Sequence, residues 1–431
     1  MTPAPLDWLF SLAQFGIKFG LDNIHALVAE LGHPERQYRT VHVAGTNGKG
    51  SVTAIVERAL RHSGLRTGRY TSPHLLDLSE RFAIDGTPVS HTDMLGAVET
   101  VRAAVERLQD RGVLEVHPTF FEVTTAVGFE LFRRYHVDIA VCEVGLGGRL
   151  DATNVLFPTA CAITSIAFDH EQYLGHTLRD IAAEKAGIIK PGVPVVVGPM
   201  SADAADAVAA RAAATGAPLT WAMTGVTVGP VTALPPGAQR FVLRTPTRDY
   251  GTVQLALAGM HQVTNAVVAV RLLEQLDASG VQLGARAVIE ALASVRWPGR
   301  LEQVVLPDGR SALLDAAHNA AAAEALAAHL DGLGDPRPLV FAAMRDKDAT
   351  AMIRALAPHA SRIVVTRAAN PRSAEPAELA ALIARVAPDA PVEIADTPGE
   401  ALARAWSASP RIVVAGSIFL LADVMKELGP S

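Results

Sequence analysis

The stretch Gly45-Thr46-Asn47-Gly48-Lys49-Gly50-Ser51 decides how the rest of the chain is organised. Before it, Val41 and Val43 alternate with small or polar residues, as in a short strand. After it, apolar residues recur at helical spacing from residue 52 to residue 60. A glycine-rich turn therefore joins a strand to a helix. Unpaired backbone N–H groups and the positive end of the helix dipole meet at such a turn, and Lys49 adds a cation. The stretch predicts a phosphate-binding loop.

The spacing of this loop differs from the common G-x-x-x-x-G-K-[ST] pattern, because Gly50 separates Lys49 from Ser51 and the first gap is shorter. It resembles the Mur ligase superfamily, and Thr-Asn-Gly-Lys-Gly-Ser in particular resembles folylpolyglutamate and dihydrofolate synthases. The resemblance implies ATP binding by residues 45–51. A glycine-rich turn without a ligand is the simpler alternative, and the order strand, loop, lysine and helix argues against it.

Length and composition are those of a globular enzyme with 431 residues, 49% of them hydrophobic, and a net charge of −6. Because one core rarely organises so long a chain, we expect two domains. The charge gives no footprint for nucleic acid or an anionic membrane. Residues 1–12 lack the segments of a signal peptide, and no apolar run is long enough to span a membrane. We expect a cytoplasmic monomer in which Cys142 and Cys161 are buried, reduced thiols.

Polar residues end or follow apolar, strand-like runs at residues 66–70, 137–144 and 160–165. Glu143 ends the second of these runs, where a carboxylate is costly to bury unless a cation meets it. Thr71-Ser72-Pro73-His74-Leu75 and Asp169-His170 follow the other two, and each alone predicts only a turn or a structural histidine. The resemblance implies that Ser72, Glu143 and His170 hold a pair of Mg²⁺ ions.

Two further strings resemble the pterin site of these synthases. Thr119-Phe120-Phe121-Glu122 is by itself a capped helix start, but the family stacks a pterin on this aromatic step. Gly145 to Asn154 matches the folate ligases almost letter for letter, and Arg149-Leu150-Asp151 resembles the form found in bifunctional enzymes. The resemblance implies that Arg81 contacts an anionic group of the substrate. The implied pterin contacts are Gly20, Leu21, Asp22, Thr119, Phe120, Phe121, Leu150, Asp151 and Ala152.

Two other signatures concern Lys185 and Asn265. A lysine on a helix is ordinarily a solvated charge, but in the ligases that this chain resembles the lysine at the position of Lys185 is carbamylated to N6-carboxylysine. Burial that lowers the lysine pKa makes such chemistry plausible. Asn265, in a His-Gln-x-x-Asn-Ala string, is implied at the nucleotide, although a buried polar group on a helix would explain it as well.

Arg296-Trp297-Pro298-Gly299-Arg300 predicts a domain boundary, because proline and glycine break the preceding helix. We therefore expect domains at 1–296 and 297–431. Strands and helices alternate after the boundary, which predicts a parallel sheet covered by helices. Asp315, His318 and Ser417 follow strands of this sheet, where open α/β sheets bind ligands. The resemblance implies that Arg300 and Asp315 contact ATP and that His318 and Ser417 contact glutamate.

The expected fold is α/β, with an N-terminal P-loop ATPase-like domain and a smaller C-terminal Rossmann-like domain. The resemblance implies an ATP-dependent amide ligase that adds L-glutamate to 7,8-dihydropteroate and to reduced folates through an acyl phosphate. A monofunctional folylpolyglutamate synthase and a muramyl-peptide ligase are the alternatives. A GTPase-like switch would need the common P-loop spacing and a guanine-specific motif, and neither is evident. The implied catalytic residues are Lys49, Glu143, His170, Lys185 and Arg300.

Overall fold

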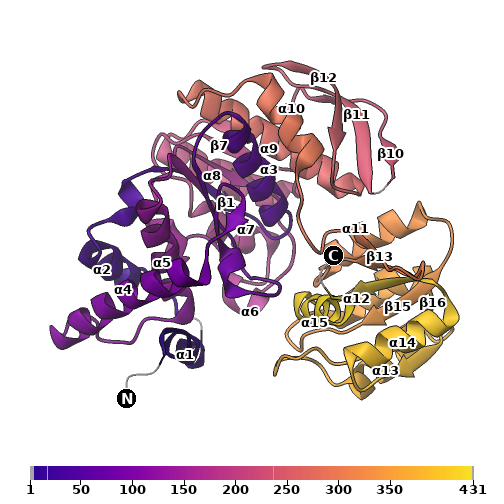
Figure 1. Ribbon diagram of the computed structural model, residues 1–431. Helices are drawn as coiled ribbons and strands as arrows, with labels where there is room; N and C mark the ends of the chain where they lie inside the picture. The colour runs from indigo at the N-terminus through magenta and orange to yellow at the C-terminus, as the bar shows by residue number, and fades with distance from the viewer. Residues whose placement is uncertain (1–3, 17, 236, 430–431) are drawn as a thin grey trace.

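The computed structural model describes residues 4–16, 18–235 and 237–429, and within these ranges the chain forms three β-sheets covered by helices (Figure 1). The first sheet has the order β4-β3-β2-β5-β1-β6-β7-β8. The strands β2, β5, β1, β6, β7 and β8 are parallel to one another. β3 and β4 are antiparallel and form one edge of the sheet. These strands are β1 (Arg39–Ala44), β2 (Thr67–Tyr70), β3 (Phe82–Ile84), β4 (Thr87–Pro88), β5 (Ile139–Glu143), β6 (Ala160–Ile163), β7 (Val195–Val197) and β8 (Leu219–Trp221).

Helices cover both faces of the first sheet because its strands are apolar on both sides. Val41 and Val43 pack on one face with α3, α9 and α10. Cys142 and Cys161, on the other face, lie in the two clusters that the remaining helices complete, and both are buried free thiols, as predicted. These helices are α1 (Pro5–Ser11), α2 (Asp22–Glu30), α3 (Lys49–His62), α4 (His91–Asp110), α5 (Phe120–Arg134), α6 (Glu171–Leu174), α7 (Leu178–Ala186), α8 (Ala202–Thr215), α9 (Met260–Ala278) and α10 (Ala285–Ser294).

The second sheet is small and antiparallel, and it packs against α10 beyond the first sheet (Figure 1). It lies within the predicted first domain, residues 1–296, and the sequence did not predict it as a separate sheet. Its strands are β9 (Thr227–Val228), β10 (Thr232–Leu234), β11 (Ala238–Arg244) and β12 (Asp249–Leu255). Short 3-10 helices occur at Leu12–Phe15, Pro34–Arg36, Leu78–Arg81, Ala152–Val155 and Ala357–His359. Residues 15–20 are predicted from the sequence as a break between two helices, and Ile17, within this break, lies outside the described residues.

The third sheet forms a separate lobe with the order β13-β14-β18-β15-β16-β17 (Figure 1). The strands β14, β18, β15, β16 and β17 are parallel, as predicted. β13 differs, because it is antiparallel to β14. The turn at residues 306–310 is too short for a parallel crossover. The lobe contains β13 (Glu302–Val305), β14 (Ser311–Leu314), β15 (Arg337–Phe341), β16 (Ala360–Val365), β17 (Val392–Ile394), β18 (Arg411–Ala415), α11 (Ala320–Asp331), α12 (Ala349–Leu356), α13 (Pro376–Val386), α14 (Pro398–Ala408) and α15 (Ile418–Leu428).

The order of strands in the first sheet brings three predicted site segments to one edge. β1 lies between β5 and β6, with Val43 opposite Glu143 and Ala44 opposite Ile163. Because these strands are parallel, the loops that follow them leave the sheet at the same edge. The phosphate loop, Glu143 and the segment that leads to His170 are therefore neighbours. None of the helices in the described ranges is both long and apolar enough to cross a membrane.

Candidate active site

The phosphate loop approaches its neighbours too closely for any side chain at two of its glycines. A Cβ atom at Gly45 would lie 1.9 Å from Thr164 Oγ1, and one at Gly48 would lie 2.3 Å from Asn265 Oδ1. Gly48 also has a φ of 85° at the N-cap of α3, a left-handed conformation that favours glycine. Asn265, which the sequence predicted at the nucleotide, therefore lies directly against the loop.

Hydrogen bonds fix the loop to the segment that follows β6. The Thr46 N–H donates to the Ser165 carbonyl at 2.7 Å. The Asn47 carbonyl accepts from Thr164 Oγ1 at 2.6 Å and from Ser165 Oγ at 3.0 Å. These hydrogen bonds use backbone groups of residues 46 and 47. The N–H groups at the start of α3 therefore remain available to a phosphate.

Lys49 lies over this loop and faces Glu143. Its Nζ donates to the carbonyls of Gly45 at 3.1 Å and Thr46 at 3.2 Å, and it lies 4.0 Å from Glu143 Oε1. Burial raises the pKa of Glu143, while Lys49 and Arg300 oppose this shift. A buried carboxylate at the end of β5, close to a cation and beside a phosphate loop, suits a site that handles charged phosphate groups.

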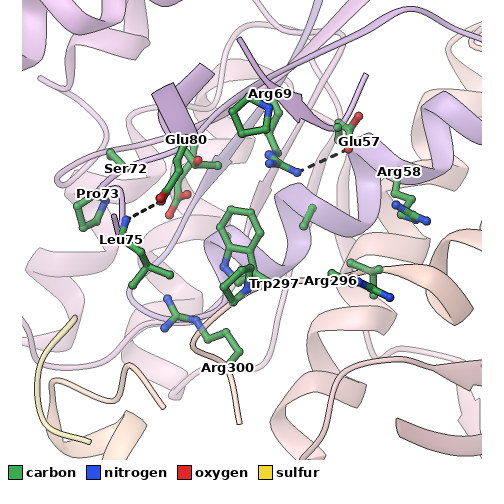
Figure 2. A pocket seen from close by; sticks show the side chains of 18 of the residues that line it. Glu57, Arg58, Arg69, Ser72, Pro73, Leu75, Glu80, Arg296, Trp297 and Arg300 are labelled. Carbon is green, nitrogen blue, oxygen red and sulfur yellow. Dashed lines mark hydrogen bonds and ion pairs between the residues drawn. The ribbon is translucent and has the colours of Figure 1, made fainter. Parts of the chain in front are cut away.

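Glu143 and Ser72 line a cavity of about 350 Å³ beside the phosphate loop, together with Arg300 and Trp297 (Figure 2). The Trp297 ring fills the space over Gly50, where a Cβ atom would lie 2.7 Å from Trp297 Nε1. Arg300 donates to the Gly299 carbonyl at 3.3 Å. The segment predicted as a domain boundary thus contributes side chains to the same cavity as the phosphate loop.

The three predicted metal ligands are divided between two places. Ser72 and Glu143 share the cavity, whereas His170 lies beside Asp169, with 3.8 Å between His170 Nε2 and Asp169 Oδ1. Among the described residues, no group of three or more His, Cys, Asp or Glu side chains is arranged to hold a metal ion. A hydroxyl and one buried carboxylate nevertheless suit Mg²⁺, which commonly takes one or two carboxylates and completes its shell with phosphate oxygens and water.

Lys185 is buried at the end of α7, not solvated. Burial, followed by the nearby charge of Lys49, lowers the pKa of Lys185 to about 7. The glycine-rich loop after β5 packs on this lysine, because a Cβ atom at Gly148 would lie 2.8 Å from the Lys185 carbonyl oxygen. This shift brings the neutral amine form of Lys185 closer to neutral pH.

Asp151 is held inside the same glycine-rich loop. Its Oδ2 accepts from the Leu146 N–H at 2.8 Å, and its Oδ1 accepts from the Thr153 N–H at 3.0 Å. Thr153 Oγ1 also pairs with His42 Nε2 at 2.8 Å, within the first sheet. Burial raises the pKa of Asp151. Asp151 thus organises its loop, and its contact with a pterin stays a prediction.

Three other predicted pterin residues, Thr119, Phe120 and Phe121, lie at the start of α5. Phe120 lies 5.3 Å below the Arg81 guanidinium, and the Phe121 ring packs on Gly145, where a Cβ atom would lie 2.4 Å from its Cζ. Thr119 caps α5 and accepts from the Glu122 N–H. Asn23, in the first turn of α2, donates to Glu122 Oε2 at 3.5 Å. Gly20, Leu21 and Asp22 immediately precede or begin this helix, and Leu150 and Ala152 flank Asp151.

Residues of the third sheet meet this site from the opposite side. The Asn47 and Asn319 side-chain amides form a reciprocal pair at 3.1 and 3.0 Å. Lys347 forms an ion pair with Asp169 and lies 3.3 Å from His170 Nε2. His318 Nε2 lies 3.6 Å from Asp169 Oδ2. The sequence did not predict roles for Asp169, Asn319 or Lys347, although Lys347 follows β15 at the carboxyl end where such sheets bind ligands.

Two predicted residues of the third sheet have backbone partners. Asp315 accepts from the N–H groups of Leu301 and Ala317, both at 2.9 Å, so it fixes the end of the boundary segment. Ser417 is buried and caps α15 by accepting from the Phe419 N–H at 3.1 Å. Both residues lie at the carboxyl ends of their strands, as predicted.

The site combines a lysine-bearing phosphate loop on the first sheet with polar residues at the strand ends of the third sheet, which face that loop. This arrangement is that of a nucleotide-dependent ligase. Residues 43–273 match the family model "Mur ligase middle domain", and residues 299–418 match "Mur ligase, glutamate ligase domain". The chain belongs to the Mur ligase superfamily, in the family of dihydrofolate and folylpolyglutamate synthases.

Individual relatives agree with this family. The chain is 36% identical over 354 residues to the dihydrofolate synthase/folylpolyglutamate synthase of Bacillus subtilis, with 81% of each chain covered. It is 36% identical over 410 residues to the folylpolyglutamate synthase of Lacticaseibacillus casei, covering 94% of this chain and 93% of the relative. A crystal structure of the Mycobacterium tuberculosis folylpolyglutamate synthase, complexed with ADP and AMPPCP, has a TM-score of 0.92 at 33% identity over 99% of each chain.

Proposed function

We propose that this chain is an ATP-dependent ligase that forms an amide between a folate carboxylate and the amine of L-glutamate. The observation that carries the proposal is that two loops of the first sheet meet the third-sheet lobe: the phosphate loop through the Asn47 and Asn319 pair, and the segment after β6 through the Asp169 and Lys347 pair. Relatives named for folate ligation cover nearly the whole chain, and one related structure is titled as a complex with AMPPCP and folate.

The residues around the cavity support phosphorylation of a carboxylate followed by attack of the glutamate amine. Phosphoryl transfer needs positioning and neutralised charge, without a covalent protein nucleophile. Lys49 and Arg300 would stabilise the transferred phosphoryl group, and Asn265 and Asp315 would border the nucleotide. Mg²⁺, when bound, would neutralise phosphate charge, and Ser72, Glu143 and His170 are the residues proposed to hold it.

The structure of the Lys185 site supports its carbamylation. The neutral amine is the form that reacts with CO₂, and burial makes that form accessible near neutral pH. The product would carry a negative charge opposite Lys49, where the unmodified lysine meets repulsion. We therefore propose that Lys185 is present as N6-carboxylysine in the active protein.

We further propose that the enzyme accepts both dihydropteroate and reduced folates. The Arg149-Leu150-Asp151 string and the gathering of Asp151 with the aromatic step of α5 support a pterin site. The monofunctional alternative would use the same ligation site without dihydropteroate. Contacts between residues 1–296 and 297–431, the two proposed domains, complete the site within one chain, so a monomer suffices.

The test is ADP release by the purified protein with ATP, Mg²⁺ and L-glutamate, with dihydropteroate or tetrahydrofolate as acceptor. We expect turnover with both acceptors. Turnover with tetrahydrofolate alone would establish the monofunctional alternative. Absence of turnover with both would contradict the proposed function and make muramyl peptides the next substrates to test.

A further inference from the structure

His42 is a fully buried polar side chain in the middle of the first sheet, and the proposed reaction does not use it. It lies on β1, opposite Cys142 on β5 and Cys161 on β6. Burial, followed by the charge of Lys190, lowers the pKa of His42 to about 3, so the imidazole is neutral near neutral pH. A neutral imidazole has one N–H donor and one acceptor nitrogen, and its partners decide which nitrogen carries the proton.

The partners of His42 assign this proton to Nε2. His42 Nε2 lies 2.8 Å from Thr153 Oγ1, whereas Nδ1 is buried without a hydrogen-bond partner among the described residues. Thr153 has a single hydroxyl proton, which it donates to Asp151 Oδ1. The Thr153 oxygen is therefore the acceptor toward His42, and Nε2 is the donor. The hydrogen bonds run in one direction, from the imidazole through the hydroxyl to the carboxylate.

Asp151, at the end of this series of hydrogen bonds, also accepts the N–H groups of Leu146 and Thr153. Burial raises the pKa of Asp151, and these donors oppose the shift by favouring the carboxylate. Thr153 is fully buried in the short 3-10 helix that follows Asp151. Asn154, in the same helix, donates to the Gly187 carbonyl at 3.2 Å. The loop is thus tied to β1 through His42 and to the end of α7 through Asn154.

We propose that His42 is a positioning residue for the pterin site: its Nε2–H orients the Thr153 hydroxyl, which in turn holds Asp151 toward the pterin. This inference rests on the proposed function, in which Asp151 contacts the pterin. Without the His42 donor, the hydroxyl is free to rotate away from the carboxylate, and the loop loses its side-chain bond to β1. The pterin substrate should then bind more weakly. ATP should be affected little, because the phosphate loop has its own hydrogen bonds to the segment after β6.

The experiment replaces His42 by two amides that place their N–H donor at different positions of the ring. The glutamine amide reaches about as far as Nε2, and the asparagine amide only about as far as Nδ1. We expect His42→Asn to raise KM for dihydropteroate about fivefold, as for one lost hydrogen bond, with kcat and KM for ATP nearly unchanged. His42→Gln should restore KM for dihydropteroate to near the wild-type value. Equal KM for dihydropteroate in the two variants, or an equal rise for dihydropteroate and ATP, would overturn the inference.

Cys161→Ala is the matched control, because Cys161 is buried opposite His42 on β6 and lies outside this series of hydrogen bonds. The lost packing should lower Tm and leave KM unchanged for both dihydropteroate and ATP. A rise in KM for dihydropteroate as large as in His42→Asn would show that any weakening of the sheet has the same effect. That result would also overturn the inference.

NMR of the ¹⁵N-histidine-labelled protein tests the direction of the hydrogen bonds without catalysis. The His42 signals are those that disappear in His42→Gln, and we expect a protonated Nε2 and an unprotonated Nδ1. A proton on Nδ1 would overturn the inference. Failure of the proposed function would look different, because the wild type would then turn over neither folate substrate while the His42 signals would still show the proton on Nε2.

Discussion

The ion pair between Lys347 and Asp169 joins the strand ends of the first and third sheets, and its removal has a calculable effect. Both side chains are 8% exposed. Burial alone would raise the pKa of Asp169. The hydrogen bond with His318 and the charges of Lys347 and His170 outweigh burial and hold this pKa well below its usual range. Lys347→Met keeps the apolar stem and removes the cation, which leaves a charged, buried carboxylate with weaker partners.

Truncating one member of a buried charge pair costs about 2–5 kcal/mol. Because the two residues belong to different sheets, the lobes can avoid this cost by separating, which rehydrates Asp169. At about 1.4 kcal/mol per tenfold change, Lys347→Met should disfavour the observed arrangement by roughly 30-fold or more. We expect kcat/KM for ligation to fall by a similar factor, with little change in Tm.

The assay is a double-mutant cycle of Lys347→Met and Asp169→Asn, measured by ligation kinetics and by small-angle scattering. The two changes should be strongly non-additive, because each removes the same interaction. The control is Lys426→Met, at an exposed lysine on α15. Additive effects, or a fall in Tm with unchanged kcat/KM and radius of gyration, would refute the assigned role of this pair.

Three further changes test the loops of the first sheet. Gly48→Ala should abolish ADP binding in calorimetry, because its Cβ atom would lie 2.3 Å from Asn265 Oδ1; normal affinity would contradict the tight loop. Lys185 is protonated below its pKa of about 7 and neutral above it, so ¹³C-bicarbonate labelling followed by NMR should show more carbamate as the pH rises from about 6 to about 8. A signal that survives Lys185→Ala would exclude this site. Asp151→Ala should reduce dihydropteroate ligation more than folylpolyglutamate extension in ADP-release assays, and equal losses would contradict the pterin role.

Local features of the fold could be predicted from sequence because their causes are local. The phosphate loop, β1 and α3 follow from alternation, glycines and helical spacing within residues 39–62. The prediction of Glu143 at a strand end is likewise confirmed, since burial of an apolar strand leaves its terminal carboxylate at the sheet edge. β14 (Ser311–Leu314) is likewise one of the strands expected from the alternation of strands and helices after the predicted boundary.

Features that depend on packing between distant segments were missed. β13 and β17 are short and only partly buried, so their apolar patterns are weak. The second sheet has its own hydrogen-bonding partners, which periodicity cannot reveal. Lys347 and Asp169 are 178 positions apart. Each looks like an ordinary surface charge in sequence, and only the approach of the two sheets makes them a buried pair.

The position of Trp297 gives the protein an intrinsic optical probe. It is one of four tryptophans, and its ring touches the phosphate loop at Gly50 while the Arg69 guanidinium lies 5.1 Å from its centroid. Indole emission is sensitive to such a charge and to water. With Trp8, Trp221 and Trp406 replaced by phenylalanine, the emission of the remaining tryptophan would follow movement of the boundary segment in real time, without a chemical label.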